Sequence, residues 1–424
     1  MRKTRNFQDY VSNKILFSLG VILLIRVGTF LPVPGINHSD LAFYIQQHSV
    51  AKTLISTFSG ENTFVIGLFT LNIFPYINAT IFVQLLTAFS PRLAELQKEG
   101  DFEGRRTMNK LTRSITLGLA IVQSSSIALY LKQVLFNWDY ILAFEIIMWL
   151  TTGAMIVLWL SDLITDYGLG NGASLLVYTN IVSNLPTLLK KLSIETSNNV
   201  MITSFSLIVS GVLIFISLYA IVFLQEGIVK VPLISSKQLN QSITRVDNFL
   251  PLRLNQAGVM PIILTTSILV IPNYIINLKI FQGLDFLTSF NFKPIYWIGY
   301  FLLVLLSSSF YAKIVVRPKD LSNQLQKMAV TIPGIRPGKQ TTRYLKRIIK
   351  EVTITGATML AIITVIPNFL ESILNITGLK GLSTTSFLIL AGVVLDLLRE
   401  IKNISLSNIY KRPPKRKYRR RRRD

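Results

Sequence analysis

The sequence predicts an all-α integral membrane protein with ten membrane-spanning helices. Half of its 424 residues are hydrophobic and only 15% are charged, whereas about 25% are charged in an ordinary soluble domain. A helix needs about 20 consecutive, mostly apolar residues to cross a bilayer, and ten runs near that length occur. They are residues 15–31, 72–90, 112–131, 140–160, 172–189, 203–224, 258–277, 295–316, 352–370 and 383–398.

The first run follows a basic start and is similar to a secretory signal peptide in that respect. Arg26 interrupts it, and it leads into Leu31-Pro32-Val33-Pro34-Gly35 instead of a cleavage site made of small residues. We therefore expect this run to be a retained membrane helix.

The stretch from Thr53 to Phe89 has 37 residues and one charge, Glu61. It is too long for one span and too short for two spans with a loop. The polar residues 59–62 predict a short half-inserted helix near 53–68, followed by a full span from about 72. Non-helical backbone at membrane depth persists only where protein covers it or where it lines a watery cavity, so the stretch predicts a cavity.

Further interruptions favour the same cavity. Gly168-Leu169-Gly170-Asn171-Gly172 opens the fifth run, Pro261 and Pro272 lie in the seventh, and Gly392 and Asp396 lie in the tenth. For any single one of these residues, a kink that serves helix packing is the better explanation. Their occurrence in several runs of one chain weakens that explanation.

Basic residues define the orientation. When alternate loops and the adjoining helix ends are taken together, 36 of the 44 Lys and Arg residues fall on the side of both termini, which the positive-inside rule places in the cytoplasm or its equivalent. Loops 225–257 and 317–351 lie on this side. The second contains a Pro- and Gly-rich turn, 332–340, that predicts a docking tip, although a solvated basic loop is the alternative.

The basic tail, Lys411 to Arg423, has ten Lys or Arg among thirteen residues. Such a run attracts anionic lipid or RNA phosphate, and a plain topology anchor is an equal alternative. The net charge of +23 accompanies too much apolar sequence for a disordered or purely nucleic-acid-binding protein.

The residues that common catalytic sites need are missing. There are no cysteines, and the two histidines, His38 and His48, lie in the loop after the first run. The phosphate-binding GxxxxGK[ST] and the zinc-binding HExxH motifs do not occur, and Asn171 stands where an aspartyl intramembrane protease requires an acid. The sequence therefore predicts no enzymatic activity, no cofactor and no metal site.

Two classes of function remain, a polymer conduit and a secondary transporter of a small solute. Transporters usually bind their solute with buried charges and unwound helices at mid-membrane. Charge is scarce in the predicted spans, whose polar residues are mainly Asn, Gln, Ser and Thr. This favours a conduit for a varied polymer, with the transporter as the alternative.

Seven motifs, in order along the chain, resemble the SecY protein-translocase channel. They are Phe58-Ser59-Gly60, Phe74-Pro75-Tyr76-Ile77-Asn78-Ala79, Gln84-Leu85-Leu86-Thr87, Lys98-Glu99-Gly100 with Gly104-Arg105-Arg106, Gly168–Ser174, Leu250–Pro261 and Pro333–Gly338. The stretch 231–235 is similar to cyanobacterial and plastid members. The resemblance thus implies a plastid thylakoid membrane, with a bacterial plasma membrane as the alternative.

The resemblance implies two five-helix halves around an hourglass pore that opens sideways between the second and seventh spans. The halves are residues 15–190 and 203–400, joined by a short external loop at 191–202. Residues 1–14 form the cytoplasmic or stromal N-terminus, and 401–424 the basic tail. The chain would pass unfolded polypeptide across the membrane and release hydrophobic segments into lipid.

Family pore-ring positions fall on Ile73, Ile77, Ala173, Val177, Ile263 and Ile389. Six aliphatic or small side chains at one level would block ions by dewetting, and for each alone a core residue is the competing interpretation. Ala173 is smaller than the usual residue, so sealing would depend on the plug. The plug falls on Thr57, Phe58, Ser59, Gly60, Glu61, Asn62, Thr63 and Phe64.

The lateral gate implied by the family carries Asn78, Gln123 and Thr266, for which helix-packing contacts are the alternative. Docking of the SecA motor or the ribosome falls on Arg336 and Lys339. In the earlier loop, which lacks the paired arginines of many bacterial members, we choose Arg245 and Arg253. The implied partners are a SecE-type subunit, a SecG-type subunit, unfolded preproteins, membrane lipid and, through the basic loops and tail, ribosomal RNA.

Overall fold

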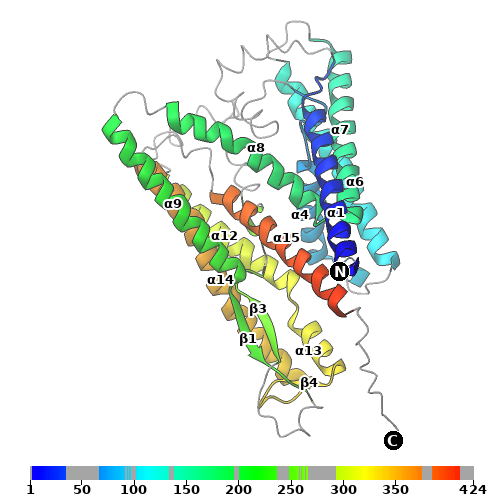
Figure 1. The fold of residues 1–424 in the computed structure, drawn as a ribbon, viewed down its shortest axis with the longest axis vertical. Coiled ribbons are helices and arrows are strands. Elements are labelled where there is room, and N and C mark those ends of the chain that lie inside the picture. Colours follow the sequence, from blue (N-terminus) through cyan, green and yellow to red (C-terminus); the bar gives the residue numbers. More distant parts are fainter. Residues whose placement is uncertain are drawn as a thin grey trace, which may run out of the picture. The chain divides into compact units, whose positions relative to one another are not determined.

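The computed structural model describes thirteen stretches of the chain (Figure 1). They are residues 2–34, 66–90, 93, 95–96, 102–132, 138–194, 200–235, 248–256, 258, 260–262, 264–265, 293–374 and 384–410.

Helices dominate these stretches. They are α1 (Arg2–Thr29), α4 (Phe74–Phe89), α6 (Phe102–Leu131), α7 (Tyr140–Tyr167), α8 (Gly172–Ile194), α9 (Val200–Glu226), α12 (Lys293–Val315), α13 (Pro318–Lys327), α14 (Lys339–Leu374) and α15 (Thr384–Tyr410). The strands are β1 (Ile228–Pro232), β2 (Ile234–Ser235), β3 (Phe249–Arg253) and β4 (Val330–Thr331).

Each predicted membrane run except the seventh coincides with one of these helices, and residues 260–262 and 264–265 of the seventh are helical. Several helices are longer than their runs. For example, α14 begins at Lys339, whereas the apolar run begins at residue 352. A search for apolar stretches finds only the part of a helix that lipid or protein surrounds, so it misses polar extensions into water.

Length and composition alone identify four spanning helices among the described residues, Val11–Thr29, Tyr140–Tyr167, Ile298–Lys327 and Lys339–Ile366. The apolar helices Phe74–Thr87, Gly172–Ser183 and Ile214–Glu226 are shorter.

The chain packs as two compact units. The first comprises Met1–Ile77, Thr116–Asn180 and Val393–Asp424. In it α1 runs beside α7 (Figure 1). Its core joins the chain around residues 33 and 66–71 to α6 and α7. The buried members of this core are Val33, Ile66, Leu71, Ala120, Ala128, Leu131, Ile146, Leu150 and Ala154.

The predicted interruption before the fifth span is the link between α7 and α8 in this unit. α7 ends at Tyr167, α8 begins at Gly172, and Gly170 has φ +79°. The Ser18 hydroxyl of α1 accepts a hydrogen bond from the Leu169 backbone N–H at 3.0 Å. The interruption is therefore a tight turn fixed to the first helix.

The second unit comprises Asn78–Ile115 and Ile181–Gly392. Here α14 packs along both α12 and α9 (Figure 1). The buried core of this bundle consists of Ile221, Leu224, Ile262, Tyr300, Val304, Leu360, Ala361, Leu388 and Ala391.

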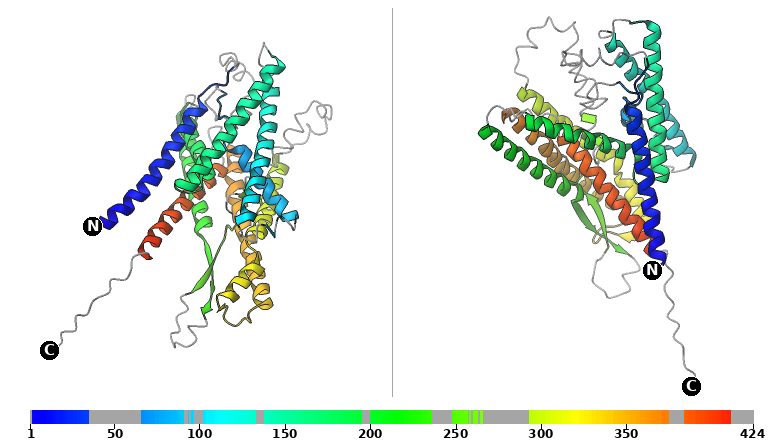
Figure 2. Two further views of the ribbon diagram at one scale, coloured as in Figure 1. Left: turned by 90° about the vertical axis from the view of Figure 1, so that its right-hand side faces the viewer. Right: turned by 45° about the horizontal axis from the view of Figure 1, so that its top comes forward.

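The two predicted loops of the basic side fold together into what we call the loop module, residues 228–235, 248–254 and 316–349. Strands β1 and β3 form an antiparallel ribbon that continues from α9 (Figure 2). Strand β2 of the first loop pairs with β4 of the second, with Ile234 opposite Thr331. One apolar core unites both loops, made of Val231, Leu233, Leu252, Leu325, Ile332, Leu345 and Ile349. The docking tip thus belongs to a folded module.

Candidate functional site

The backbone that leads into α4, residues 66–73, is called the entry turn. Successive hydrogen bonds join Thr70 N–H to the Gly67 carbonyl at 3.1 Å and Asn72 N–H to the Phe69 carbonyl at 2.9 Å. Asn72 has φ +48°, a left-handed conformation that Asn tolerates better than most residues. This non-helical segment is buried in protein, as expected for irregular backbone beside a membrane helix.

The entry turn is fixed to α1 and α7 by contacts that leave no room for a side chain. Val33 N–H donates to the Ile66 carbonyl at 3.0 Å, and Leu68 N–H donates to the Leu31 carbonyl at 2.9 Å. A Cβ atom at Gly67 would overlap the carbonyl oxygen of Thr29, and one at Gly153 of α7 would overlap that of Leu68. The start of α4 therefore has one position relative to these two helices.

The entry turn positions the first two predicted ring residues. Ile73 is 1% exposed and Ile77 is 9% exposed, and Ile77 N–H donates to the Ile73 carbonyl at 3.1 Å. Side chains four residues apart lie on the same face of a helix. Both side chains therefore occupy one face at the beginning of α4.

A hydrogen bond between side chains brings α8 to the entry turn. Asn72 Nδ2 donates to Asn180 Oδ1 at 3.0 Å, across 108 positions of sequence. On α8, Ala173 and Val177 precede Asn180 by seven and three residues, which places all three on one helix face. Both α8 ring residues are half-buried. The structure thus joins α8, which carries two predicted ring residues, to the turn that leads into the other two.

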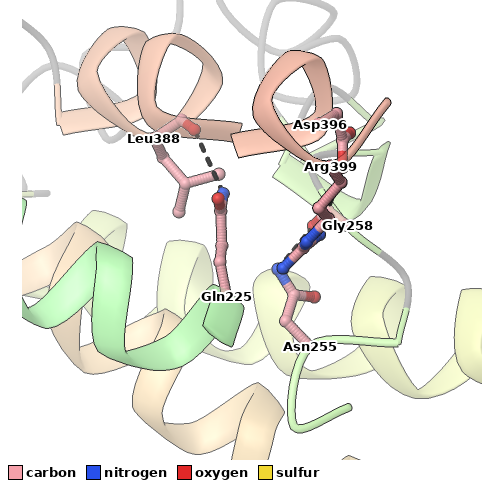
Figure 3. A network of polar contacts seen from close by, with 6 residues as sticks. All are labelled: Gln225, Asn255, Gly258, Leu388, Asp396 and Arg399. Carbon is pink, nitrogen blue, oxygen red and sulfur yellow. Dashed lines mark hydrogen bonds and ion pairs between the residues drawn. The ribbon is translucent and has the colours of Figure 1, made fainter. Parts of the chain in front are cut away.

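The remaining ring positions belong elsewhere. Ile389 lies half-buried on α15 in the second unit. The preceding residue, Leu388, accepts a hydrogen bond on its carbonyl from the buried Gln225 Nε2 of α9 at 3.3 Å (Figure 3). Ile263 lies outside the described residues, as do all the plug positions, 57–64.

The predicted gate residues are described in part. Asn78 is half-buried on α4. Gln123 of α6 has an Oε1 atom that is buried without a hydrogen bond in the described part of the chain. Thr266 lies outside that part. Just before it, Asn255 Nδ2 donates to the Gly258 carbonyl at 3.0 Å and closes a turn at the start of the seventh run (Figure 3).

The predicted docking residues lie on the loop module. Arg253 is exposed on β3. Arg336 and Lys339 are exposed within and just after a turn in which Gly334 and Gly338 have φ of +74° and +102°. The Thr341 hydroxyl donates to the Arg336 carbonyl at 2.9 Å. The backbone that carries Arg336 is therefore ordered by the first turn of α14. Arg245 lies outside the described residues.

A basic stripe that sequence reasoning missed continues from this turn along α14. Its exposed members, three or four residues apart, are Lys339, Arg343, Lys346 and Lys350. Neighbouring Arg347 forms an exposed ion pair with Glu351 at 3.0 Å. The helical spacing of these cations was visible in the sequence, but the helix was expected to begin only at residue 352.

Three kinds of comparison agree on what this chain is similar to. The pattern of the SecY family matches residues 67–398. A protein translocase subunit SecY from Trieres chinensis is 57% identical over 421 residues, covering 96% of this chain and 99% of that protein. SecY subunits from Guillardia theta and from Synechocystis are 39% and 37% identical and cover 94% of this chain and 96% and 92% of those proteins.

Solved structures have the same fold. A SecY translocation channel, described for the plug domain that stabilises its closed state, aligns with a TM-score of 0.66 at 17% identity, over 95% of this chain and 94% of that one. Sec61 from a canine ribosome-channel complex of the endoplasmic reticulum aligns with a TM-score of 0.60 at 17% identity, with the same coverage.

Proposed function

The chain belongs to the SecY family, and from this premise we propose how its residues divide among a pore constriction, a lateral gate and a docking surface. The observation that carries the function is the 57% identity to a SecY subunit over 96% of the chain. The protein is the channel-forming subunit of a protein translocase, with ten membrane-spanning helices around a polypeptide-conducting pore. The predicted conduit is confirmed, and the transporter alternative is set aside.

The pore constriction consists of Ile73, Ile77, Ala173, Val177, Ile263 and Ile389. Its support is the burial of Ile73 and Ile77 and the hydrogen bond that joins α8 to the entry turn. Aliphatic side chains at one level exclude water and ions when the pore is empty, because a narrow apolar constriction dewets. The same side chains carry no fixed charge and yield around a passing polypeptide.

The plug, residues 57–64, completes the seal. Ala173 offers less volume than the other ring residues, so the ring alone closes incompletely on the α8 side. The plug segment precedes the entry turn directly, and that turn is fixed to α1 and α7.

The lateral gate consists of Asn78, Gln123 and Thr266. Its support is the buried Oε1 atom of Gln123, a polar acceptor on an apolar helix. Hydrogen bonds between membrane helices contribute only about 0.6 kcal/mol each. A gate closed by such weak bonds opens readily, because the packing of an apolar signal helix between the gate helices compensates for the hydrogen bonds that are lost.

The docking surface for a SecA motor or a ribosome consists of Arg245, Arg253, Arg336 and Lys339. Its support is the ordered presentation of three exposed cations on the loop module. The similar Sec61 structure comes from a ribosome-channel complex. The channel catalyses no reaction of its own, so the docked partner supplies the driving force.

The chain assembles with a SecE-type and a SecG-type subunit in a thylakoid membrane. Similarity to proteins from plastids and cyanobacteria supports a thylakoid or plasma membrane, and of these two we propose the thylakoid. The basic tail contacts anionic lipid or ribosomal RNA on the cytoplasmic or stromal side.

Reconstitution tests this proposal. The full chain is placed in liposomes with a SecE-type subunit, SecA and ATP, and an unfolded preprotein is added. We expect preprotein to become protected from external protease only when all components are present. Solute uptake without preprotein protection, or failure of the chain to co-purify with the SecE-type subunit, would contradict the assignment.

A further inference from the structure

We propose that Asn72 and Asn180 form a positioning pair that fixes α4 to α8 beside the pore ring and limits ion leak through the resting channel. Asn72 Nδ2 donates to Asn180 Oδ1 at 3.0 Å, and Asn72 is 5% exposed. The inference rests on the proposed pore ring and adds two residues to it, of which Asn180 was not singled out from the sequence.

The Asn72 side chain connects two structures at once. Its Oδ1 atom accepts a hydrogen bond from the backbone N–H of Ile73 at 2.8 Å, while its Nδ2 atom reaches Asn180. The left-handed backbone of Asn72, φ +48°, aims the amide back across the start of α4. The position of Ile73 is therefore coupled through one rigid amide to α8.

Asn180 lies on the ring-bearing face of α8. Ala173, Val177 and Asn180 follow the spacing i, i+4 and i+7, which repeats on one side of a helix. A buried amide without a partner is costly in apolar surroundings. The two side chains satisfy one another, so their approach is favoured in one register of α4 against α8.

The proposed ring gives this register a functional role. The Asn72–Asn180 hydrogen bond joins the residue next to Ile73 to the face of α8 that carries Ala173 and Val177. It restrains the start of α4 against that face. We therefore expect α4 and α8 to keep their spacing while the channel is at rest.

The test is a double-mutant cycle in the full chain, reconstituted with its partner subunits in planar bilayers. The variants are Asn72→Gly, which permits the left-handed backbone, Asn180→Ala, and the double variant. Each single variant should raise resting ion conductance about threefold, in line with the modest strength of hydrogen bonds between membrane helices. The double variant should leak no more than either single variant, because all three lose the same bond.

Two controls make the outcomes decisive. Thr179→Val removes a neighbouring hydroxyl whose hydrogen bond stays within α8, to the Leu175 carbonyl, and should leave conductance unchanged. Ile77→Asn should leak through the ring itself. If Ile77→Asn leaks while both asparagine variants match the parent, or if their effects multiply in the double variant, the pair has no positioning role. If Ile77→Asn is also silent in folded protein, the ring assignment fails with it. Loss of thermal stability without added conductance would likewise overturn the proposal.

Discussion

At the scale of single residues, close backbone contacts position the entry turn. The Leu68 carbonyl oxygen occupies the place that a Cβ atom would take at Gly153, and the Thr29 carbonyl oxygen does the same at Gly67. Any side chain at these positions would displace the entry turn that carries Ile73. Glycine is needed here for close approach, since neither residue has a left-handed backbone.

Replacing Gly153 by Ala should destabilise the protein. The added Cβ atom would overlap the Leu68 carbonyl oxygen, and overpacking of this kind costs about 1–3 kcal/mol. Gly118→Ala is the matched control, because no atom lies within 4 Å of a Cβ atom added there and alanine favours a helix. Thermal unfolding in detergent should show a lower midpoint for Gly153→Ala alone. Equal midpoints for both variants would mean that the entry turn adapts freely.

Replacing Ile77 by Asn tests the ring. If Ile77 lines a dry constriction, a polar side chain there should wet it and raise ion conductance without loss of fold. An Ile77 that packs only in the protein core would instead cost about 1–3 kcal/mol of stability as an unsatisfied amide, with no added conductance. Planar-bilayer recording and thermal unfolding of one preparation distinguish these results. Deleting residues 57–65 in the same background should leak further.

Some residues of the candidate site could be identified from the sequence and others could not. Ile73 and Ile77 were identified through the family resemblance, and both are buried. Burial fits a constriction and a packed core alike, so the ring stays a prediction. Asn180 was missed, because an isolated Asn on an apolar helix has many uses and its partner lies 108 positions away. Ile263 and Thr266, like the plug, lie outside the described residues, so those assignments remain predictions.

At the scale of elements, the loop module joins two basic loops in one folded unit, which carries the surface that we propose for docking. The Pro-Gly turn ends in α14, where the Ser322 hydroxyl of α13 donates to the Gly338 carbonyl at 3.2 Å. Arg336 is thus presented by an ordered backbone while its side chain faces solvent.

Reversing the charge at this turn should separate folding from transport. Arg336→Glu changes an exposed side chain, and such changes usually alter stability by less than about 0.5 kcal/mol. Insertion and thermal unfolding should match the parent, whereas partner-driven translocation should fall sharply, with weaker partner binding. Lys132→Glu, an exposed charge reversal just after α6, is the control and should transport normally. If Arg336→Glu transports preprotein at the parent rate, Arg336 is a solvated loop charge without a docking role.

Elements differed in how far the sequence predicted them. The membrane-spanning helices could be predicted from the sequence, because a long apolar run within a membrane can satisfy its backbone hydrogen bonds only as a helix or in a closed barrel. The strands β2 and β4 were not found, since each has two residues and they pair across about a hundred positions. Short strands are specified by their partners more than by their own composition.

At the scale of the whole molecule, the distribution of basic residues predicts one orientation. Tags near Asn6 and Asn408 and a protease site near Gln340 should all be reached from the cytoplasmic or stromal side. Labelling of intact and opened vesicles measures this. If one of the three sites is protected from reagent in vesicles whose orientation exposes the other two, the ten-span arrangement is wrong. The division into halves at 15–190 and 203–400 also remains a prediction.

The composition of the loop module has a consequence for the order of events during synthesis. Strand β2 and the Val231–Leu233 part of the core leave the ribosome early, but their partners Leu325, β4 and Leu345 follow only after the seventh and eighth spans have been made. Chains are completed from the N-terminus onward and domains fold as units. A half-made chain therefore lacks the complete loop module, and with it the surface that we propose for docking, until most of its spans have been made.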